Sequence, residues 1–156
     1  MPKVTSCLVF IGLLAYSYGL NLKCASGFQY YIPPVAGNWF QATEYCNSIG
    51  MRLAVITNAQ ENDNVIAFVE ADSRNIPVVW IGGNDYGEEG EFYWQPTGVK
   101  FSYTSWSSGQ PDNAGGNENC VETKSAYGWK WNDAKCHLVQ HFVCENVDSK
   151  KVVVLF

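Results

Sequence analysis

QPDNAGGNENCVETKSAYGWKWNDAKC, residues 110–136, brings many side-chain oxygens and two cysteines into one short segment. Calcium takes six to eight oxygen ligands from carboxylates, amide carbonyls and backbone. A bridge between Cys120 and Cys136, if it forms, would close a loop around these oxygens and lower the entropy cost of assembling a site. The candidate ligands are Gln110, Asp112, Glu118, Asn132 and Asp133.

The segment lies in a half of the chain that is rich in short β-type runs separated by Gly, Asn, Asp and Pro. Between two of these runs, Thr97–Asn119 contains few strand formers, and a structureless loop of that length in a compact domain is usually functional. The predicted strands are Val78–Ile81, Phe92–Trp94, Cys120–Thr123, Trp129–Trp131 and His141–Glu145.

The preceding part of the chain has a helical pattern. Residues 38–48 place Trp39, Ala42, Tyr45 and Cys46 on one helical face, with Asn38 as the expected cap.

A second helix is predicted from Asn58, where Glu61 completes a capping-box pattern, and Val65, Ile66 and Phe68–Val69 supply its buried stripe. A strand over Leu53–Ile56 lies between the two helices. Helices followed by short strands predict an α+β fold.

The first residues have the features of a secretory signal peptide over 1–19: Lys3, the apolar run Cys7–Tyr16 and small residues before the expected cut after Gly19. A buried N-terminal helix is the alternative, but the run shows no apolar periodicity. No stretch reaches the roughly 20 apolar residues of a membrane span. We therefore expect a secreted, extracellular protein without membrane insertion.

Removal of residues 1–19 would leave an odd number of cysteines. In an oxidising compartment this count predicts two bridges and one leftover thiol. Zinc binding is the rival use, but the cysteines lack zinc-knuckle spacing and His137 and His141 are isolated. The remaining cysteines are Cys24, Cys46, Cys120, Cys136 and Cys144.

Composition and motifs exclude several classes of function. Apolar residues make up 47% of the chain and charged residues 16%, so the chain can bury a core. The net charge of −5 comes without any basic cluster, which argues against nucleic acid as a partner. No arrangement typical of a nucleophile with its base, a zinc protease or a phosphate-binding glycine loop is present, so we expect no enzyme activity.

Taken singly, Gln110-Pro111-Asp112 or Asn132-Asp133 is more often a turn than a ligand set. Their combination with other motifs resembles the C-type lectin family, over residues 24 to about 147. We therefore expect a lectin domain over 20–147 and a tail over 148–156. The other motifs are Trp80-Ile81-Gly82-Gly83, Trp131-Asn132-Asp133, the helix with Trp39 and Cys46, and Phe142-Val143-Cys144-Glu145.

The resemblance implies a double-loop α+β domain with two helices and short antiparallel strands, braced by the disulfides Cys46–Cys144 and Cys120–Cys136. It implies that Trp80 and Trp131 belong to the core and that the bond before Pro111 is cis. It further implies that one calcium is held by Gln110, Asp112, Glu118, Asn132 and Asp133, and that the same side chains bind the sugar.

Within the family, Gln-Pro-Asp resembles the motif of members that bind galactose and N-acetylgalactosamine. The aromatic ring that often follows this motif is absent here, because residues 113–117 read NAGGN. We expect Trp129 to contact the sugar instead, with Tyr127 as a second candidate and core packing as the alternative for both. The expected partners are glycans on cell or microbial surfaces, with agglutination if the protein is multivalent.

A second calcium position is found in part of the family, and Asp85 and Glu89 match two of its acids. Asn113 and Asn119 stand where acids often occur, so an auxiliary calcium and a solvated acidic loop remain alternatives.

Two questions remain open from the sequence. Cys24 is left without a partner and predicts either a disulfide-linked homodimer or capping by a small thiol. A protein- or surface-binding module on the same fold is the alternative to sugar binding.

Overall fold

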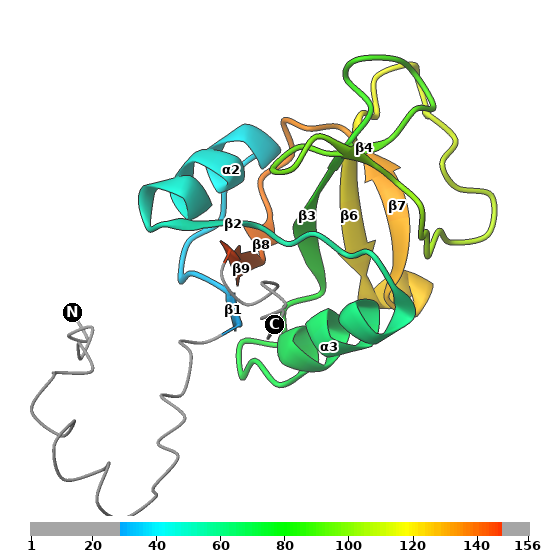
Figure 1. The fold of residues 1–156 in the computed structure, drawn as a ribbon. Helices are drawn as coiled ribbons and strands as arrows, with labels where there is room; N and C mark the ends of the chain where they lie inside the picture. The colour runs from blue at the N-terminus through cyan, green and yellow to red at the C-terminus, as the bar shows by residue number, and fades with distance from the viewer. Residues whose placement is uncertain (1–28, 148–156) are drawn as a thin grey trace, which may run out of the picture.

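The computed structural model describes residues 29–147, which form one α+β domain (Figure 1). No helix in this part of the chain is long and apolar enough to cross a membrane. The described elements are, in chain order, β1 (Tyr30–Tyr31), α2 (Trp39–Ser48), β2 (Met51–Leu53), α3 (Ala59–Glu70), β3 (Val78–Asn84), β4 (Tyr93–Trp94), β5 (Val99–Lys100), β6 (Cys120–Lys124), the 3-10 turn η2 (Ser125–Tyr127), β7 (Lys130–Ala134), β8 (His141–Phe142) and β9 (Cys144–Asn146).

Helix α2 begins and packs as its sequence predicts. The Asn38 side chain accepts a hydrogen bond from the backbone N–H of Gln41, and the Gln41 side chain accepts from the backbone N–H of Asn38. This reciprocal capping box satisfies two backbone donors that a helix start leaves unpaired. Trp39, Ala42 and Cys46 are buried along one face.

Helix α3 confirms the predicted cap but corrects its partner. Asn58 accepts from the backbone N–H of Glu61, whereas the Glu61 carboxylate reaches Thr57, one residue before the cap, and accepts from its N–H at 2.7 Å. The capping box expected between Asn58 and Glu61 is therefore only half formed. The fully buried positions are Asn62, Val65 and Val69, while Ile66 and Phe68 are partly buried.

Several strands differ in extent from their predictions. The strand expected over Leu53–Ile56 lies earlier, at Met51–Leu53, because Ala54 and the two residues after it are buried without joining a strand ladder. The strand expected over His141–Glu145 is split into β8 and β9, and β1 and β5 were not expected. Strand β7 starts after Trp129 and continues to Ala134, so it includes Asn132 and Asp133.

The strands form two sheets. In the smaller sheet, β9 lies between β1 and β2, and both neighbours are antiparallel to it. The larger sheet has the order β5-β4-β3-β6-β7, with β8 parallel to β3 beside it. The loop from Phe101 to Asn119 first runs along β7, where Ser105 and Ser107 hydrogen-bond to the backbone of Trp131. It then passes over one end of the β6–β7 pair, at the top in Figure 1, and α3 lies at the opposite end.

Two disulfides brace these layers, and their pairing is the one that the family resemblance implied. Cys46–Cys144 joins α2 to β9, and Cys120–Cys136 joins the start of β6 to the residues after β7. The second bridge closes the loop that contains Asn132 and Asp133.

The core is built around tryptophans. Trp80 and Trp131 are completely buried, as predicted. Trp131 makes edge-to-face contacts with Trp94, Phe101 and Trp106. Because Trp131 directly precedes Asn132, the aromatic cluster fixes the strand from which the site residues project.

Candidate metal centre

Three carboxylates meet where the long loop approaches β7. One ligand oxygen from each of Asp112, Glu118 and Asp133 lies within 4.8 Å of the others. Within residues 29–147, no other group of His, Cys, Asp or Glu residues was found to meet in this way. Like charges at this separation repel one another, so the cluster favours a bound cation.

Asp133 is the anchor of the cluster. Its side chain is on β7 with the residue only 1% exposed, and it accepts hydrogen bonds from the backbone N–H groups of Asp112 at 3.2 Å and Asn113 at 2.8 Å. These bonds tie the loop that follows Pro111 to the rigid strand. The carboxylates therefore come together through backbone contacts that the sequence pattern alone does not reveal.

Glu118 is held by the same turn of the loop. Its carboxylate accepts from the backbone N–H of Ala114 at 3.1 Å, and its own N–H donates to the Asn113 side chain at 3.0 Å. Burial raises the pKa of the Glu118 carboxyl above its ordinary value, partly offset by the Ala114 hydrogen bond. The negative charges of Asp133 and Asp112 raise this pKa further.

Gln110 contributes an oxygen that lacks a partner. Its side-chain carbonyl Oε1 is buried and accepts no hydrogen bond. A buried polar atom without a partner costs free energy, and such atoms are rare in folded proteins. The Gln110–Pro111 bond is cis, as the resemblance implied. An uncompensated carbonyl on the motif that also carries Asp112 fits a calcium ion, which prefers oxygen ligands.

Asn132 is oriented by a residue that the sequence analysis missed. Asn132 is 7% exposed, and its amide Nδ2 donates to Oε1 of Glu122 on the paired strand β6 at 3.1 Å. The same nitrogen also donates to the backbone carbonyl of Asp133 at 2.5 Å, so the side-chain carbonyl Oδ1 is the atom that remains for a cation. The sequence does contain one indication of this role, because Glu122 is an acid within the predicted strand Cys120–Thr123. Gln140 also donates to Glu122, at 2.7 Å.

Replacing Glu122 by alanine is expected to weaken calcium binding by roughly 10- to 100-fold, the usual cost of losing a side chain that orients a metal ligand. The substitution removes one of the two acceptors that orient the Asn132 amide nitrogen, but it removes no candidate ligand. Calcium titration by calorimetry measures the effect, and Gln140→Ala, which leaves the Asn132 contact in place, is the control. Unchanged calcium affinity in Glu122→Ala would contradict the positioning role.

At the auxiliary position, Asp85 is hydrogen-bonded within the protein. The Asp85 carboxylate accepts from the backbone N–H of Gly90 at 2.8 Å and from Nδ2 of Asn119 at 3.1 Å. Glu89 is exposed and Asn113 pairs with Glu118. If residue 119 were an acid, its carboxylate and that of Asp85 could both bind a cation. The amide of Asn119 instead donates a hydrogen bond to Asp85, which favours the solvated acidic loop.

Trp129, which was expected to contact the sugar beside the calcium, lies at the other end of the β6–β7 pair from the carboxylate cluster. Its indole Nε1 donates to Glu70, the last residue of α3, at 2.7 Å. Trp129 is the residue before β7, whereas Asp133 is near the end of that strand. Tyr127 lies in the same connection, with the Lys124 ammonium 4.1 Å from its ring centroid. Both residues precede Lys130, where β7 begins, and the strand from Lys130 to Asp133 alone spans about 10 Å, so they lie at the opposite end of the β6–β7 pair.

Comparisons with known proteins agree with this architecture. The family model described as "Lectin C-type domain" matches residues 35–146. Salivary C-type lectin 1 of Aedes albopictus is 37% identical over 132 residues, which cover 80% of this chain and 86% of that protein.

Two solved structures extend the likeness to three dimensions. The carbohydrate-recognition domain of the mouse scavenger receptor C-type lectin superposes with a TM-score of 0.67 at 27% identity, covering 75% of this chain and 89% of that one. The carbohydrate-recognition domain of cow CD23, solved in the presence of a GlcNAc2Man3 oligosaccharide, gives 0.65 at 35% identity, with 75% and 85% covered.

Proposed function

The chain belongs to the C-type lectin family, and from this premise we propose that it binds carbohydrate through calcium, with a preference for galactose and N-acetylgalactosamine. Its domain is a carbohydrate-recognition domain. Lectins bind carbohydrate without catalysing a reaction, so the chain is not an enzyme.

Two observations carry the proposal: three carboxylates gather at one point, and Gln110, two residues before one of them, has a buried side-chain oxygen Oε1 without a hydrogen-bond partner. Carbonyl and carboxylate oxygens are the donors that calcium takes, and nothing in the set favours zinc, because it holds no sulfur or imidazole. The residues that would hold the ion are Gln110, Asp112, Glu118, Asn132 and Asp133.

A bound calcium would supply coordination positions for two neighbouring sugar hydroxyls. The side chains act on the same hydroxyls through hydrogen bonds, because a carboxylate only accepts whereas an amide both donates and accepts. The exposed carboxylate of Asp112 and the partly exposed side chain of Gln110 are accessible to a sugar. Which of the two positions carries the amide and which the carboxylate therefore determines which arrangement of sugar hydroxyls the site binds.

Exchanging the two groups in Gln110→Glu/Asp112→Asn is expected to move the sugar preference from galactose towards mannose. The double variant keeps the charge and the number of oxygens but swaps donors and acceptors around Pro111. Binding of the purified protein to a glycan array with calcium measures the change.

Wild-type protein with chelator is the control for this experiment, and the part of its binding that depends on calcium should disappear. Galactose binding that is equally strong with calcium and with chelator would contradict calcium dependence, whereas an unchanged preference in the double variant would contradict only the selectivity rule. Absent sugar binding in the wild type would favour the alternative, a protein- or surface-binding module on this fold.

Secretion and dimerisation complete the proposal. The signal peptide over 1–19, the tail over 148–156 and Cys24 lie outside the described residues. Cys24 would link two chains and raise avidity for a surface that displays many sugars. Migration of the alkylated protein at monomer mass on a non-reducing gel would contradict the dimer.

A further inference from the structure

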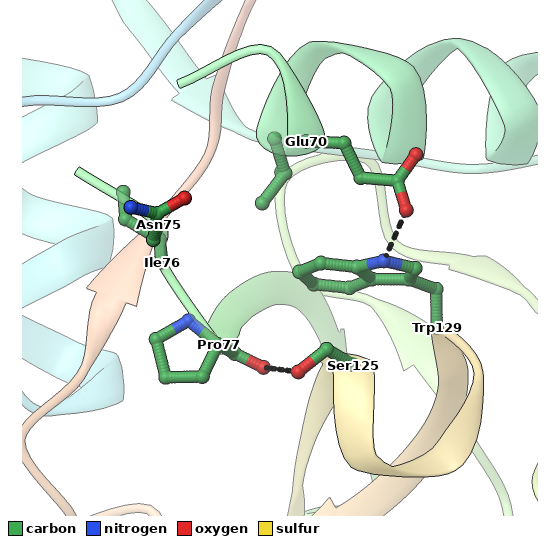
Figure 2. Close-up of a pocket in the computed structure, with 7 residues that line it drawn as sticks. Glu70, Asn75, Ile76, Pro77, Ser125 and Trp129 are labelled. Carbon is green, nitrogen blue, oxygen red and sulfur yellow. Dashed lines mark hydrogen bonds between the residues drawn. The ribbon is translucent and has the colours of Figure 1, made fainter. Parts of the chain in front are cut away.

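A hollow of about 400 Å³ lies at one end of the β6–β7 pair (Figure 2). The carboxylate cluster is at the opposite end of the same pair. Its walls come from the end of α3, the segment before β3 and the connection between β6 and β7. The lining residues are Val69, Glu70, Asn75, Ile76, Pro77, Ser125 and Trp129. Hollows of this size hold small ligands when apolar surface and a few polar groups converge.

The lining has this mixed character. Figure 2 shows the Trp129 indole across the hollow from Asn75, Ile76 and Pro77, with Glu70 beside its ring nitrogen. Ile76 and Val69 are buried and supply apolar floor, whereas Glu70, Asn75 and Ser125 are exposed. An aromatic ring is therefore flanked by a carboxylate, an amide and the Ser125 hydroxyl, which donates to the Pro77 carbonyl at 3.2 Å and keeps its lone pairs for another donor.

The indole is held in place by polar contacts. Its Nε1 donates to Oε1 of Glu70 at 2.7 Å, which leaves Oε2 of that exposed carboxylate for another donor. The backbone of Trp129 is fixed as well, because its N–H donates to the Lys124 carbonyl at 2.9 Å and its carbonyl accepts from the Thr123 hydroxyl at 2.8 Å. The ring is thus oriented before any ligand arrives.

The backbone conformation adds a second observation. Trp129 has φ 60° and Asn75 has φ 52°, both in the left-handed region. A bulky residue in this region is an outlier, and such outliers cluster at ligand sites. In the described residues one other non-glycine residue, Asn113, has positive φ, and it lies at the carboxylate centre.

We propose that this hollow is a second sugar-binding site, which takes a neutral pyranose ring without a metal. The apolar C–H face of the ring packs on the Trp129 indole. Sugar hydroxyls donate to Oε2 of Glu70 and exchange hydrogen bonds with the amide of Asn75, since both kinds of group are within the lining.

The site differs from the calcium-dependent one in place and in chemistry. Trp129 directly precedes β7, and the strand from Lys130 to Asp133 separates it from the carboxylate cluster by about 10 Å. The lining contains a single acid, so it offers no calcium cage. One chain with sites at both ends of β6–β7 could contact two glycans without a disulfide-linked partner.

A cationic ligand is the competing occupant, because an indole and a carboxylate also suit an ammonium group. The Glu70 carboxylate already accepts the indole N–H, and the amide of Asn75 and the hydroxyl of Ser125 match hydroxyls and do not attract a cation. These features favour the sugar.

The test is a titration of the purified protein with galactose, mannose or choline in chelator, followed by NMR of the indole N–H signals. The Trp129 signal is assigned with Trp129→Phe. We expect saturable shifts of this signal with at least one sugar, and roughly tenfold weaker binding in Glu70→Gln, which loses a charged acceptor. Tyr86→Ala, an exposed aromatic outside the hollow, should bind as wild type.

The opposite results would overturn the inference. These are the absence of a saturable shift with either sugar, undiminished binding in Glu70→Gln, or binding of choline in place of sugar. Since chelator is present throughout, failure here leaves the calcium-dependent site untouched. Failure of the calcium-dependent site appears separately, as array binding that is the same with calcium and with chelator.

Discussion

Replacing Asp133 by asparagine is expected to lower calcium affinity by more than the roughly 10- to 100-fold that removal of an orienting neighbour costs. Asp133 is a candidate ligand, and it also receives the two backbone N–H groups that hold the Asp112 loop on β7. Asparagine keeps the size but loses the charge, and its amide nitrogen cannot accept from the second N–H. Ligand charge and loop position are therefore lost together.

The measurement is the rise in Tm on adding calcium, because a ligand that binds the folded state stabilises it in proportion to ln(1 + [Ca²⁺]/Kd). Wild type should show this rise, and Asp133→Asn should show almost none at the same concentration. Asp63→Asn, an exposed acid on α3, is the matched control and should keep it. An Asp133→Asn protein that is folded in chelator and binds calcium like wild type would refute the assigned centre.

The parts of the fold that could be predicted are those set by local chemistry. Asn38 and Asn58 cap helices because their side chains reach a backbone N–H three residues on. The long loop before Cys120 was recognisable from its lack of strand formers. The five oxygen-bearing residues could be selected from the quoted segment and its family resemblance. The gathering of Asp112, Glu118 and Asp133 depends on backbone contacts across the loop, which the sequence does not show.

The errors arise where tertiary contacts override local pattern. Ala54–Ile56 is apolar like a strand, but it is buried between sheets, where the Ala54 N–H donates to Val143 and its carbonyl accepts from Gly82. Trp129 alternates with Trp131, which suggested one continuous strand. Its left-handed backbone instead turns the side chain towards α3, a change that no periodicity signals.

Core and site are linked through β7. Trp131 contributes a buried side chain to the aromatic cluster, and the next two residues on the same strand are Asn132 and Asp133. Because side chains on a strand are fixed by its register, the position of the carboxylate depends on how well Trp131 is packed. The disulfide Cys120–Cys136 holds the same pair of strands at the end nearest the site.

Replacing Trp131 by alanine is expected to lower the free energy of unfolding by about 3–5 kcal/mol, the usual range for a large buried aromatic residue. Trp131 is 0% exposed and packs against Trp94, Phe101 and Tyr103. Its Nε1 also donates to Asn62 on α3 at 2.9 Å, so the truncation leaves a buried acceptor without its donor. Urea unfolding with the disulfides intact, analysed at constant m-value, measures the change.

Trp131→Phe separates the two contributions, because phenylalanine fills most of the space but cannot donate to Asn62. The loss from this variant should be smaller and closer to the roughly 1–3 kcal/mol of an unsatisfied buried polar group. Phe40→Ala, which removes an aromatic side chain that is 46% exposed, is the surface control. If Trp131→Ala destabilised the protein no more than Phe40→Ala, the aromatic cluster would not be what fixes β7, and the position of Asp133 would have to depend on the disulfide and the loop hydrogen bonds.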